Sequence, residues 1–423
     1  MTIVQPTLLD LNIQCLRELR RYLNICDIVS LAEAYNITES NVNELENSED
    51  NTEHLTKSKF IQFAWAVQEM FLHINGPSIN INHTDRSLND INNEFQFYVK
   101  LLRHFGSYIK ELNVIVRKEG IEAGKLFGDA IQTYCRESLV SIKVTSIDGD
   151  FLSNISQPFP NVETLKICGE QLGVNPIKFN KWFPKLRSLE FGDTNFTNPE
   201  CIEHHFPQLT RLVIQNQKNF STGFLTCTSL GIALHLNPQL ESLRISDAFG
   251  LANAINFNKS LLVFIKRKLP NLRRLQLISR QYGWRGDSEF ISIDSLTRLK
   301  VVAYESESLM TIPVRSNQMT QLHLKILNNF DGFDGIMEFV KKNATVYALT
   351  ISAKIKHFHL NDDKFANFIS GLKYLKTLAI EYYWQDNEAI DAIVHFLSIC
   401  SKIKRFDIFW WTSDLEPKEH DIC

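Results

Sequence analysis

The sequence predicts an α/β solenoid, a chain of repeated units that each contain one short strand and, in most units, a helix. Three observations predict this fold. One apolar pattern recurs from residue 109 to the C-terminal region, stretches with helical spacing lie between its copies, and several copies follow the same proline-containing turn. The 423 residues, 44% of them hydrophobic and 22% charged, can bury a large core, while 17 glycines and 12 prolines exclude collagen-like and low-complexity classes.

Residues 8–35 predict two short helices that meet at a tight turn. Apolar residues recur three and four positions apart in both, as on the buried face of an amphipathic helix. Asp27 is placed to cap the second helix. The two apolar stripes are Leu16, Leu19, Tyr22 and Leu23, then Ile28, Leu31, Ala32 and Tyr35.

The next segments predict a linker and a helical lead-in. Residues 40–56 carry acidic side chains without any Lys or Arg, which is typical of a solvated connection. Phe60, Phe63, Val67 and Phe71 have the spacing of an amphipathic helix. We therefore expect residues 8–56 to form a helical segment with an acidic linker, and residues 57–104 to form a helical N-terminal cap.

From residue 105 to residue 411, a unit of the form apolar, two variable, apolar, one variable, apolar recurs at a mean spacing of about 27 residues. The last two apolar residues alternate with polar ones, so each unit predicts a short strand with one buried face. Five copies agree closely: Val162/Leu165/Ile167, Leu186/Leu189/Phe191, Leu209/Leu212/Ile214, Leu240/Leu243/Ile245 and Leu272/Leu275/Leu277. Seven are weaker: Ile109/Leu112/Val114, Leu139/Ile142/Val144, Leu299/Val302/Tyr304, Met319/Leu322/Leu324, Val346/Leu349/Ile351, Leu375/Leu378/Ile380 and Ile403/Phe406/Ile408.

Helices and turns are expected between these strands. Residues 260–268 and 389–400 have apolar positions three and four apart and predict helices. Five strands follow a turn with proline at its second position, which ends the preceding helix and favours an extended entry. These turns are residues 159–161, 183–185, 206–208, 237–239 and 269–271, and residues 412–423 are expected to form a C-terminal tail.

The strand pattern resembles the leucine-rich repeats of the helix-containing, ribonuclease-inhibitor-like kind, over roughly residues 100 to 411. The resemblance implies a horseshoe with a parallel concave sheet, an irregular helical convex side and a role in protein recognition. Because the units vary in length, some repeats are expected to lack a full helix. The alternative is an ordinary α/β domain with chance matches.

Residues 11–23, Leu-Asn-Ile-Gln-Cys-Leu-Arg-Glu-Leu-Arg-Arg-Tyr-Leu, and residues 27–32, Asp-Ile-Val-Ser-Leu-Ala, resemble an F-box, particularly the divergent form that precedes leucine-rich repeats in insect proteins. The resemblance implies docking to the adaptor subunit of an SCF-type ubiquitin ligase, with the chain as substrate receptor for ubiquitin-dependent degradation of an unknown target protein. It assigns adaptor binding to Leu11, Leu16, Leu19, Leu23, Ile28 and Leu31. Alternatively, these helices only cap the first repeat of a scaffold or regulatory protein-binding module.

Residues that flank the apolar strand positions are expected on the concave face. Arg211, Arg244 and Arg274 lie there in consecutive repeats, and arginine pairs with carboxylates and phosphates through two hydrogen bonds. They predict either a basic site for an acidic or phosphorylated segment or three solvated surface residues.

Aromatic residues that follow several strands predict a second binding feature, a rim of interface anchors. For the residues nearest the C-terminus, the alternative is a cap that packs over the last repeat. The rim residues are Tyr282, Trp284, Tyr383, Trp384 and Trp410.

The sequence contains no motif of catalysis, of cofactor binding or of metal binding. It has no glycine-rich phosphate loop and no nucleophile elbow, and the histidine pairs 204/205 and 357/359 lack a third ligand at a suitable spacing. The net charge of −3 gives no reason to expect a nucleic-acid partner. Because these motifs are absent, we expect protein partners and no enzyme activity, small-molecule substrate or cofactor. Eight scattered cysteines predict buried reduced thiols, and the absence of a leader or long apolar stretch predicts a cytoplasmic or nuclear protein without membrane contact.

Overall fold

The computed structural model divides the chain into two compact units, Met1–Leu186 and Arg187–Cys423. This boundary falls inside the region that the repeat pattern covers. The structure describes residues 23–35, 37, 61–69, 71, 78–82, 88–116, 121–146, 155–168, 177–192, 204–215, 227–247, 259–279, 291–303, 314–326, 334–343, 345–353, 363–383 and 389–411.

The described part of the first unit is a parallel sheet with helices. Its strands pair in chain order, each with the next. The strands are β1 (Ser78–Asn82), β2 (Glu111–Val116), β3 (Ser141–Ser146) and β4 (Thr164–Cys168). The helices are α2 (Ile25–Ala34), residues 61–69, α5 (Leu88–Phe105), the 3-10 turn η3 (Gly106–Tyr108), α6 (Ile121–Tyr134) and α8 (Ile177–Trp182).

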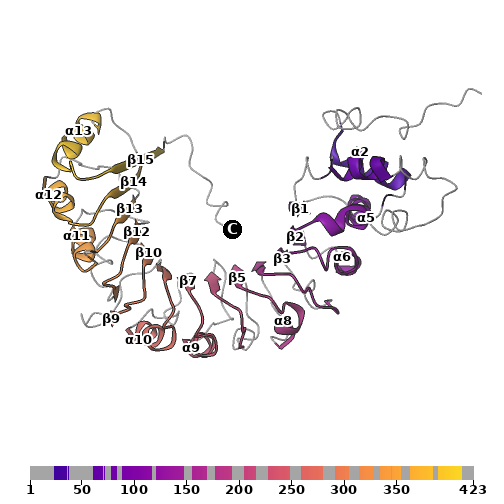
Figure 1. Ribbon diagram of the computed structural model, residues 1–423, viewed down its shortest axis with the longest axis horizontal. Coiled ribbons are helices and arrows are strands. Elements are labelled where there is room, and N and C mark those ends of the chain that lie inside the picture. The colour runs from indigo at the N-terminus through magenta and orange to yellow at the C-terminus, as the bar shows by residue number, and fades with distance from the viewer. Residues whose placement is uncertain are drawn as a thin grey trace, which may run out of the picture. The chain divides into compact units, whose positions relative to one another are not determined.

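The second unit repeats the same plan, and its helices lie along one face of a parallel sheet (Figure 1). The strands, in sheet order, are β5 (Ser188–Gly192), β6 (Arg211–Gln215), β7 (Ser242–Asp247), β8 (Arg274–Ser279), β10 (Arg298–Ala303), β12 (Gln321–Ile326), β13 (Ala348–Ala353), β14 (Thr377–Tyr383) and β15 (Arg405–Trp411). The helices are α9 (Cys227–Leu236), α10 (Lys259–Lys268), α11 (Asp334–Lys341), α12 (Asp363–Gly371) and α13 (Ala389–Ile399). Repeated strand–helix units of this kind form a solenoid-like α/β fold, which confirms the coarse prediction.

The second unit also contains two short strands outside the main sheet. Between β8 and β10, and between β10 and β12, the described residues form two short strands in place of a helix. These are β9 (Ile291–Ser292) and β11 (Val314–Arg315), which pair in parallel, and β9 packs beside α10.

The core is a ladder of aliphatic side chains that the parallel register aligns across the strands. Leu212, Leu243 and Leu275 occupy neighbouring positions and are at most 3% exposed. Their neighbours in sequence point to the opposite face, because successive side chains of a strand alternate. The pattern that predicted the strands therefore also decided which face of each strand is buried.

The proline turns pack one repeat against the next through the residue that precedes the proline. Phe159 and Phe183 are buried, and their stacked rings lie 5.8 Å apart. Phe206 and Leu269 are buried at the corresponding positions, whereas Pro184, Pro207 and Pro270 are exposed. Within each unit, the turns therefore add buried apolar side chains beside the strand ladder.

The unit around β10 corrects one predicted register. Leu299 pairs with Leu275, and Val301 pairs with Leu277, so the apolar triplet is Leu296/Leu299/Val301 rather than Leu299/Val302/Tyr304. Leu296 is fully buried, and this places Val302 on the face opposite the helices. The correct triplet fits the same sequence pattern three residues earlier.

Two further differences concern the N-terminal part. Strand β1 lies within the segment that was expected to be helical, and it pairs with β2. The N-cap of α2 is Asn24 rather than Asp27. The Asn24 side chain accepts hydrogen bonds from the Cys26 and Asp27 amides at 2.8 and 3.1 Å, and Asp27 Oδ2 accepts one from the Asn24 amide at 2.9 Å. Asp27 is thus the third residue of a reciprocal capping box.

The prediction of buried thiols is confirmed for three of the four cysteines whose side chains the structure describes. Cys135, Cys168 and Cys400 are buried free thiols, whereas Cys26 is exposed on α2. Burial raises the pKa of the Cys135 thiol to about 12, so this side chain stays protonated and packs as a small apolar group.

His104 gives the first unit a predictable pH dependence. Burial lowers its pKa below 6.5, although a 2.7 Å hydrogen bond between Nδ1 and the Ile37 carbonyl opposes this shift. As the pH falls below 6.5, the unfolded chain takes up a proton that the folded chain takes up only at lower pH, so stability declines in that range. We therefore expect the urea concentration at the unfolding midpoint of the first unit to decrease when the pH is lowered from about 7.5 to about 5.5. His104→Gln keeps a donor without titrating, and an equal pH dependence in this variant would contradict the assignment.

Candidate partner-binding face

The sheet of the second unit has one face toward the helices and one face away from them, which we call the open face. Two rows of side chains cross this open face, because the strands are in parallel register. The first row is Ser188, Arg211, Ser242, Arg274, Arg298, Gln321, Ala348, Thr377 and Arg405. The second row is Glu190, Val213, Arg244, Gln276, Lys300, His323, Thr350, Ala379 and Asp407.

The register brings the three predicted arginines onto the same face. Arg211 and Arg274 lie in the first row, both in register with Ser242, and Arg244 lies in the second row on the strand between them. Arg211 and Arg274 are exposed, and Arg244 is half-buried. Other residues that the sequence placed on this face, such as Val213 and Ala379, occupy the expected positions but are buried.

Three more cations extend this arginine group. Arg298 and Lys300 lie on β10, and Lys325 follows on β12 at the next open-face position after His323. We call the six cations together the basic face: Arg211, Arg244, Arg274, Arg298, Lys300 and Lys325. Arg298 and Lys300 were not predicted on this face, because the triplet predicted for the β10 unit lay three residues too far along the chain. Leu296, a leucine three residues before Leu299, is the signal that could have found them.

Carboxylates lie at the margins of the open face rather than within the basic face. The open-face positions of the described strands β6 to β13 contain no Asp or Glu. Glu190 lies on β5 at one side. Asp407 lies on β15 at the other side, where its carboxylate accepts a 2.7 Å hydrogen bond from Arg405. The basic face is therefore a band of one sign, five strands wide from β6 to β12.

Glu190 contacts the edge of this band. Its carboxylate lies 3.8 Å from the Arg211 guanidinium, and Gln215 Nε2 donates to it at 3.5 Å. Burial lowers the pKa of Arg244, the negative charge of Glu190 opposes this shift, and the positive charge of Arg211 adds to it. Glu190 is thus an internal counter-charge that two arginines share.

The aromatic rim is only partly described. Tyr383 is the last residue of β14, and Trp410 lies within β15 rather than after it, in register with Tyr382. Tyr282, Trp284 and Trp384 lie outside the described residues. The rim therefore stays a prediction from the sequence.

The predicted adaptor-binding residues are divided in the same way. Leu11, Leu16 and Leu19 lie outside the described residues. The other three residues of the set are Leu23 and Leu31, which are half-buried, and Ile28, which is fully buried on α2.

Helix α2 is attached to the helices that follow it. It packs against α5, where Lys100 Nζ lies 2.9 Å from the Glu33 carboxylate. The Tyr35 ring lies 4.7 Å from the ring of Phe63 in the 61–69 helix. The buried stripe of α2 therefore belongs to the core of the first unit.

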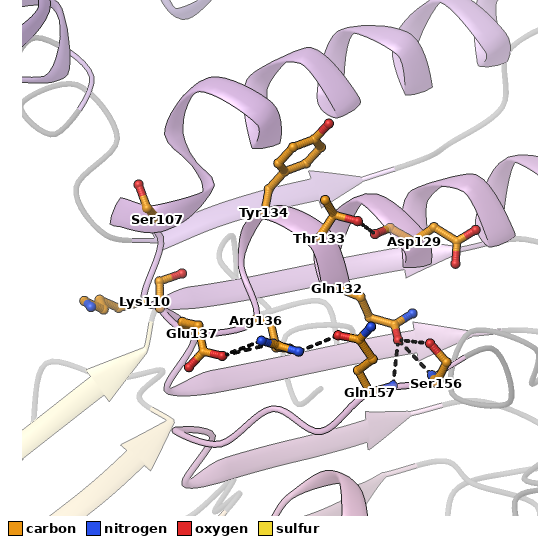
Figure 2. A pocket seen from close by; sticks show the side chains of 11 residues that line it. Ser107, Lys110, Asp129, Gln132, Thr133, Tyr134, Arg136, Glu137, Ser156 and Gln157 are labelled. Carbon is orange, nitrogen blue, oxygen red and sulfur yellow. Dashed lines mark hydrogen bonds and ion pairs between the residues drawn. The ribbon is translucent and has the colours of Figure 1, made fainter. Parts of the chain in front are cut away.

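A polar pocket of about 670 Å³ lies in the first unit near the C-terminal end of α6 (Figure 2). Its side chains bond one another. The Gln132 side-chain oxygen accepts hydrogen bonds from the Ser156 and Gln157 amides at 2.7 and 3.1 Å, and Arg136 bonds the side chains of Gln157 and Glu137 (Figure 2). These bonds join the end of α6 to the segment that precedes β4, so the pocket marks a junction between repeats.

Of the two histidine pairs, the structure describes His204 and His205. His204 packs edge-on against Phe206, and His205 Nδ1 lies 2.7 Å from the Leu236 carbonyl oxygen. The pair 357/359 lies outside the described residues. In the described part of the chain, no three His, Cys, Asp or Glu side chains are placed to hold a metal ion. None of the described helices is both long and apolar enough to cross a membrane.

The chain was compared with protein-family models and with curated proteins. No protein-family model matches the chain, and no curated protein matches it. A functional assignment therefore rests on the fold and on the charges and contacts of the open face.

Proposed function

We propose that the chain is a protein-recognition module that binds a partner protein on the open face of its second unit. The helices cover one face of this sheet and leave the other uncovered (Figure 1). One observation carries this proposal: on the uncovered face, the strands from β5 to β12 carry a row of polar and charged side chains, four of which are exposed: Arg211, Arg274, Arg298 and Gln321. Repeat proteins use such extended faces for partner binding. The resemblance to leucine-rich repeats favours the same role.

The F-box resemblance extends the proposal to a ligase. In this role, residues 11–32 dock to the adaptor subunit of an SCF-type ubiquitin ligase, and the open face presents the captured target for ubiquitination. A stable adaptor interface buries on the order of 800 Å² on each partner. Leu23 and Leu31 are half-buried within the first unit and retain apolar area for such a contact.

The second candidate function is a scaffold or regulatory binding module without a ligase role. The burial of Ile28, Val29 and Ala32 favours it, because this stripe of α2 already packs within the first unit. On this alternative, the N-terminal helices only shield the apolar end of the repeat array, as repeat proteins require.

Affinity purification of the full-length chain distinguishes the two roles. For the ligase role, we expect the adaptor and cullin subunits to co-purify with the wild-type chain and to be lost from a Leu16→Asp/Leu23→Asp variant, because both substitutions place a charge in the expected apolar contact. Ser30→Asp, on the exposed side of α2, is the matched control and should retain them. Absence of the adaptor from the wild-type sample, or its retention by the double variant, would leave the scaffold role.

A further inference from the structure

We infer that the basic face binds an extended acidic segment of a partner polypeptide, whose Asp and Glu side chains pair with its arginines. This inference rests on the proposed function and deepens it, because it states the chemistry of the partner. Four features of the described residues carry it: the repulsion within the basic face, the contact with Glu190, the width of the band and the kinds of side chain within it.

The basic face holds like charges close together. Arg274 on β8 and Arg298 on β10 are direct register partners, and both are exposed. Like charges directly opposite each other on neighbouring strands destabilise a sheet. No described carboxylate lies within ion-pair distance of either guanidinium. An acidic ligand placed over this pair would be attracted to both guanidinium groups and would also offset the repulsion between them. Both effects favour binding.

The protein itself shows that the band accepts a carboxylate. Glu190 lies at its edge, 3.8 Å from Arg211, and its charge partly offsets the effect of burial on the pKa of Arg244. The planar guanidinium of arginine can bond a carboxylate through two parallel hydrogen bonds. The 3.8 Å distance between Arg211 and Glu190 is too long for even a single hydrogen bond. A carboxylate from a partner can approach Arg211 and Arg244 from the open side and complete this geometry. Glu190 then competes with the ligand for the same cations.

The width of the band matches a short extended peptide. Its five strands, β6, β7, β8, β10 and β12, are separated by four spacings of about 4.8 Å, which give about 19 Å. An extended chain rises about 3.3 Å per residue, so about six residues cross the band. Alternate side chains of such a segment point toward the sheet about 6.6 Å apart, so about three of its six side chains meet cations of the band.

The side chains of the band favour a polypeptide over a nucleic acid. Single-stranded nucleic acids bind grooves that combine cations with aromatic rings for base stacking. The described open-face positions of β6 to β12 carry no Phe, Tyr or Trp, and they lie beside the carboxylate of Glu190. That carboxylate would repel a phosphate backbone that continued beyond the band.

Fluorescence anisotropy with the full-length chain tests the inference. The probe is fluorescein-labelled hexaglutamate, and hexaglutamine carries the same label as its uncharged counterpart. We expect hexaglutamate to bind at least about tenfold more tightly than hexaglutamine, and its affinity to fall as the salt concentration rises from about 50 to about 300 mM. A Glu190→Gln variant should bind hexaglutamate more tightly, because it removes the competing carboxylate.

Two charge-reversal variants locate the site. Arg274→Glu/Arg298→Glu should weaken hexaglutamate binding by at least about tenfold, because it reverses two exposed cations of the basic face. Lys266→Glu/Arg267→Glu makes the same change in net charge on two exposed residues of α10 and is the matched control. It should retain the wild-type affinity within about twofold, because exposed charges beyond a Debye length are screened.

Several results would overturn the inference. Equal binding of the two peptides, equal losses in the two double variants, or weaker binding by Glu190→Gln would each contradict it. Tighter binding of a twelve-residue oligothymidylate than of hexaglutamate would assign the face to nucleic acid instead. If a co-purified partner protein is lost from Arg274→Glu/Arg298→Glu while hexaglutamate does not bind, the proposed function stands and the acidic segment is wrong.

Discussion

Replacing Asn237 by alanine is expected to lower the free energy of unfolding of the second unit by about 3 kcal/mol. Asn237 is 1% exposed and links two repeats. Its side-chain oxygen accepts a 2.8 Å hydrogen bond from the Phe206 amide, and its nitrogen donates to the His204 and Ala233 carbonyls at 2.7 and 2.8 Å. Alanine would leave these backbone groups unpaired in a region that excludes water, and such groups are costly.

Urea unfolding, with hydrogen exchange of the β6 and β7 amides as a local readout, measures this loss. Asn343→Ala should behave similarly, because Asn343 is fully buried and bonds the Ser316 amide at 3.1 Å and the Phe339 carbonyl at 3.2 Å. Asn317 is exposed, so Asn317→Ala is the matched control and should change stability by less than about 0.5 kcal/mol. An equal effect of the Asn237 and Asn317 substitutions would contradict the role of these bonds.

Gly106→Ala is expected to destabilise the first unit by about 2 to 3 kcal/mol, through a steric clash rather than a lost bond. A Cβ atom at Gly106 would lie 2.6 Å from the Tyr134 carbonyl oxygen and 2.9 Å from Cys135 Sγ. The first of these neighbours is backbone at the end of α6, so it cannot rotate away. Ser138, whose hydroxyl donates to the Gly106 carbonyl at 2.7 Å, would be displaced as well.

Gly371 offers a control for this substitution. It ends α12, and a Cβ atom there would meet nothing within 4 Å. Gly371→Ala should therefore change the free energy of unfolding by less than about 1 kcal/mol, and in the stabilising direction, because alanine reduces the freedom of the unfolded chain. Thermal unfolding of the two variants beside the wild type makes the comparison. A Gly106→Ala protein as stable as the wild type would show that η3 can move away from α6.

Most strands could be predicted from the sequence because a half-buried strand alternates apolar and polar residues within a few positions. Leu189 and Phe191, for example, mark β5 without reference to any other part of the chain. The predicted register of the β10 unit was wrong by three residues. Val302 is apolar although it lies on the open face, so it also fits the repeat pattern. Strand β1, with the sequence Ser-Ile-Asn-Ile-Asn, was not predicted because it lies before residue 109, where the recognised repeat pattern begins.

The candidate site was predicted in part for the same reason. Arg211, Arg244 and Arg274 could be placed on one face from the strand alternation alone. The contact between Arg211 and Glu190 could not be predicted, because it depends on the side-chain geometry of two neighbouring strands. The sequence placed Asn237 in a proline turn but did not predict its hydrogen bonds. Asn237 occupies the buried position before the proline where other turns have Phe206 and Leu269.

The sequence by itself determined the α/β class, the positions of most strands and the face that most of them bury, because these are local properties of alternation and turn chemistry. The tertiary structure decided which strand positions lie next to one another across the basic face, which carboxylate contacts it, and which buried side chains join the repeats. These contacts link residues about one repeat apart, such as Asn237 with Phe206 and Arg274 with Arg298. Only the register between strands brings such residues together, and the packing of whole repeats sets that register.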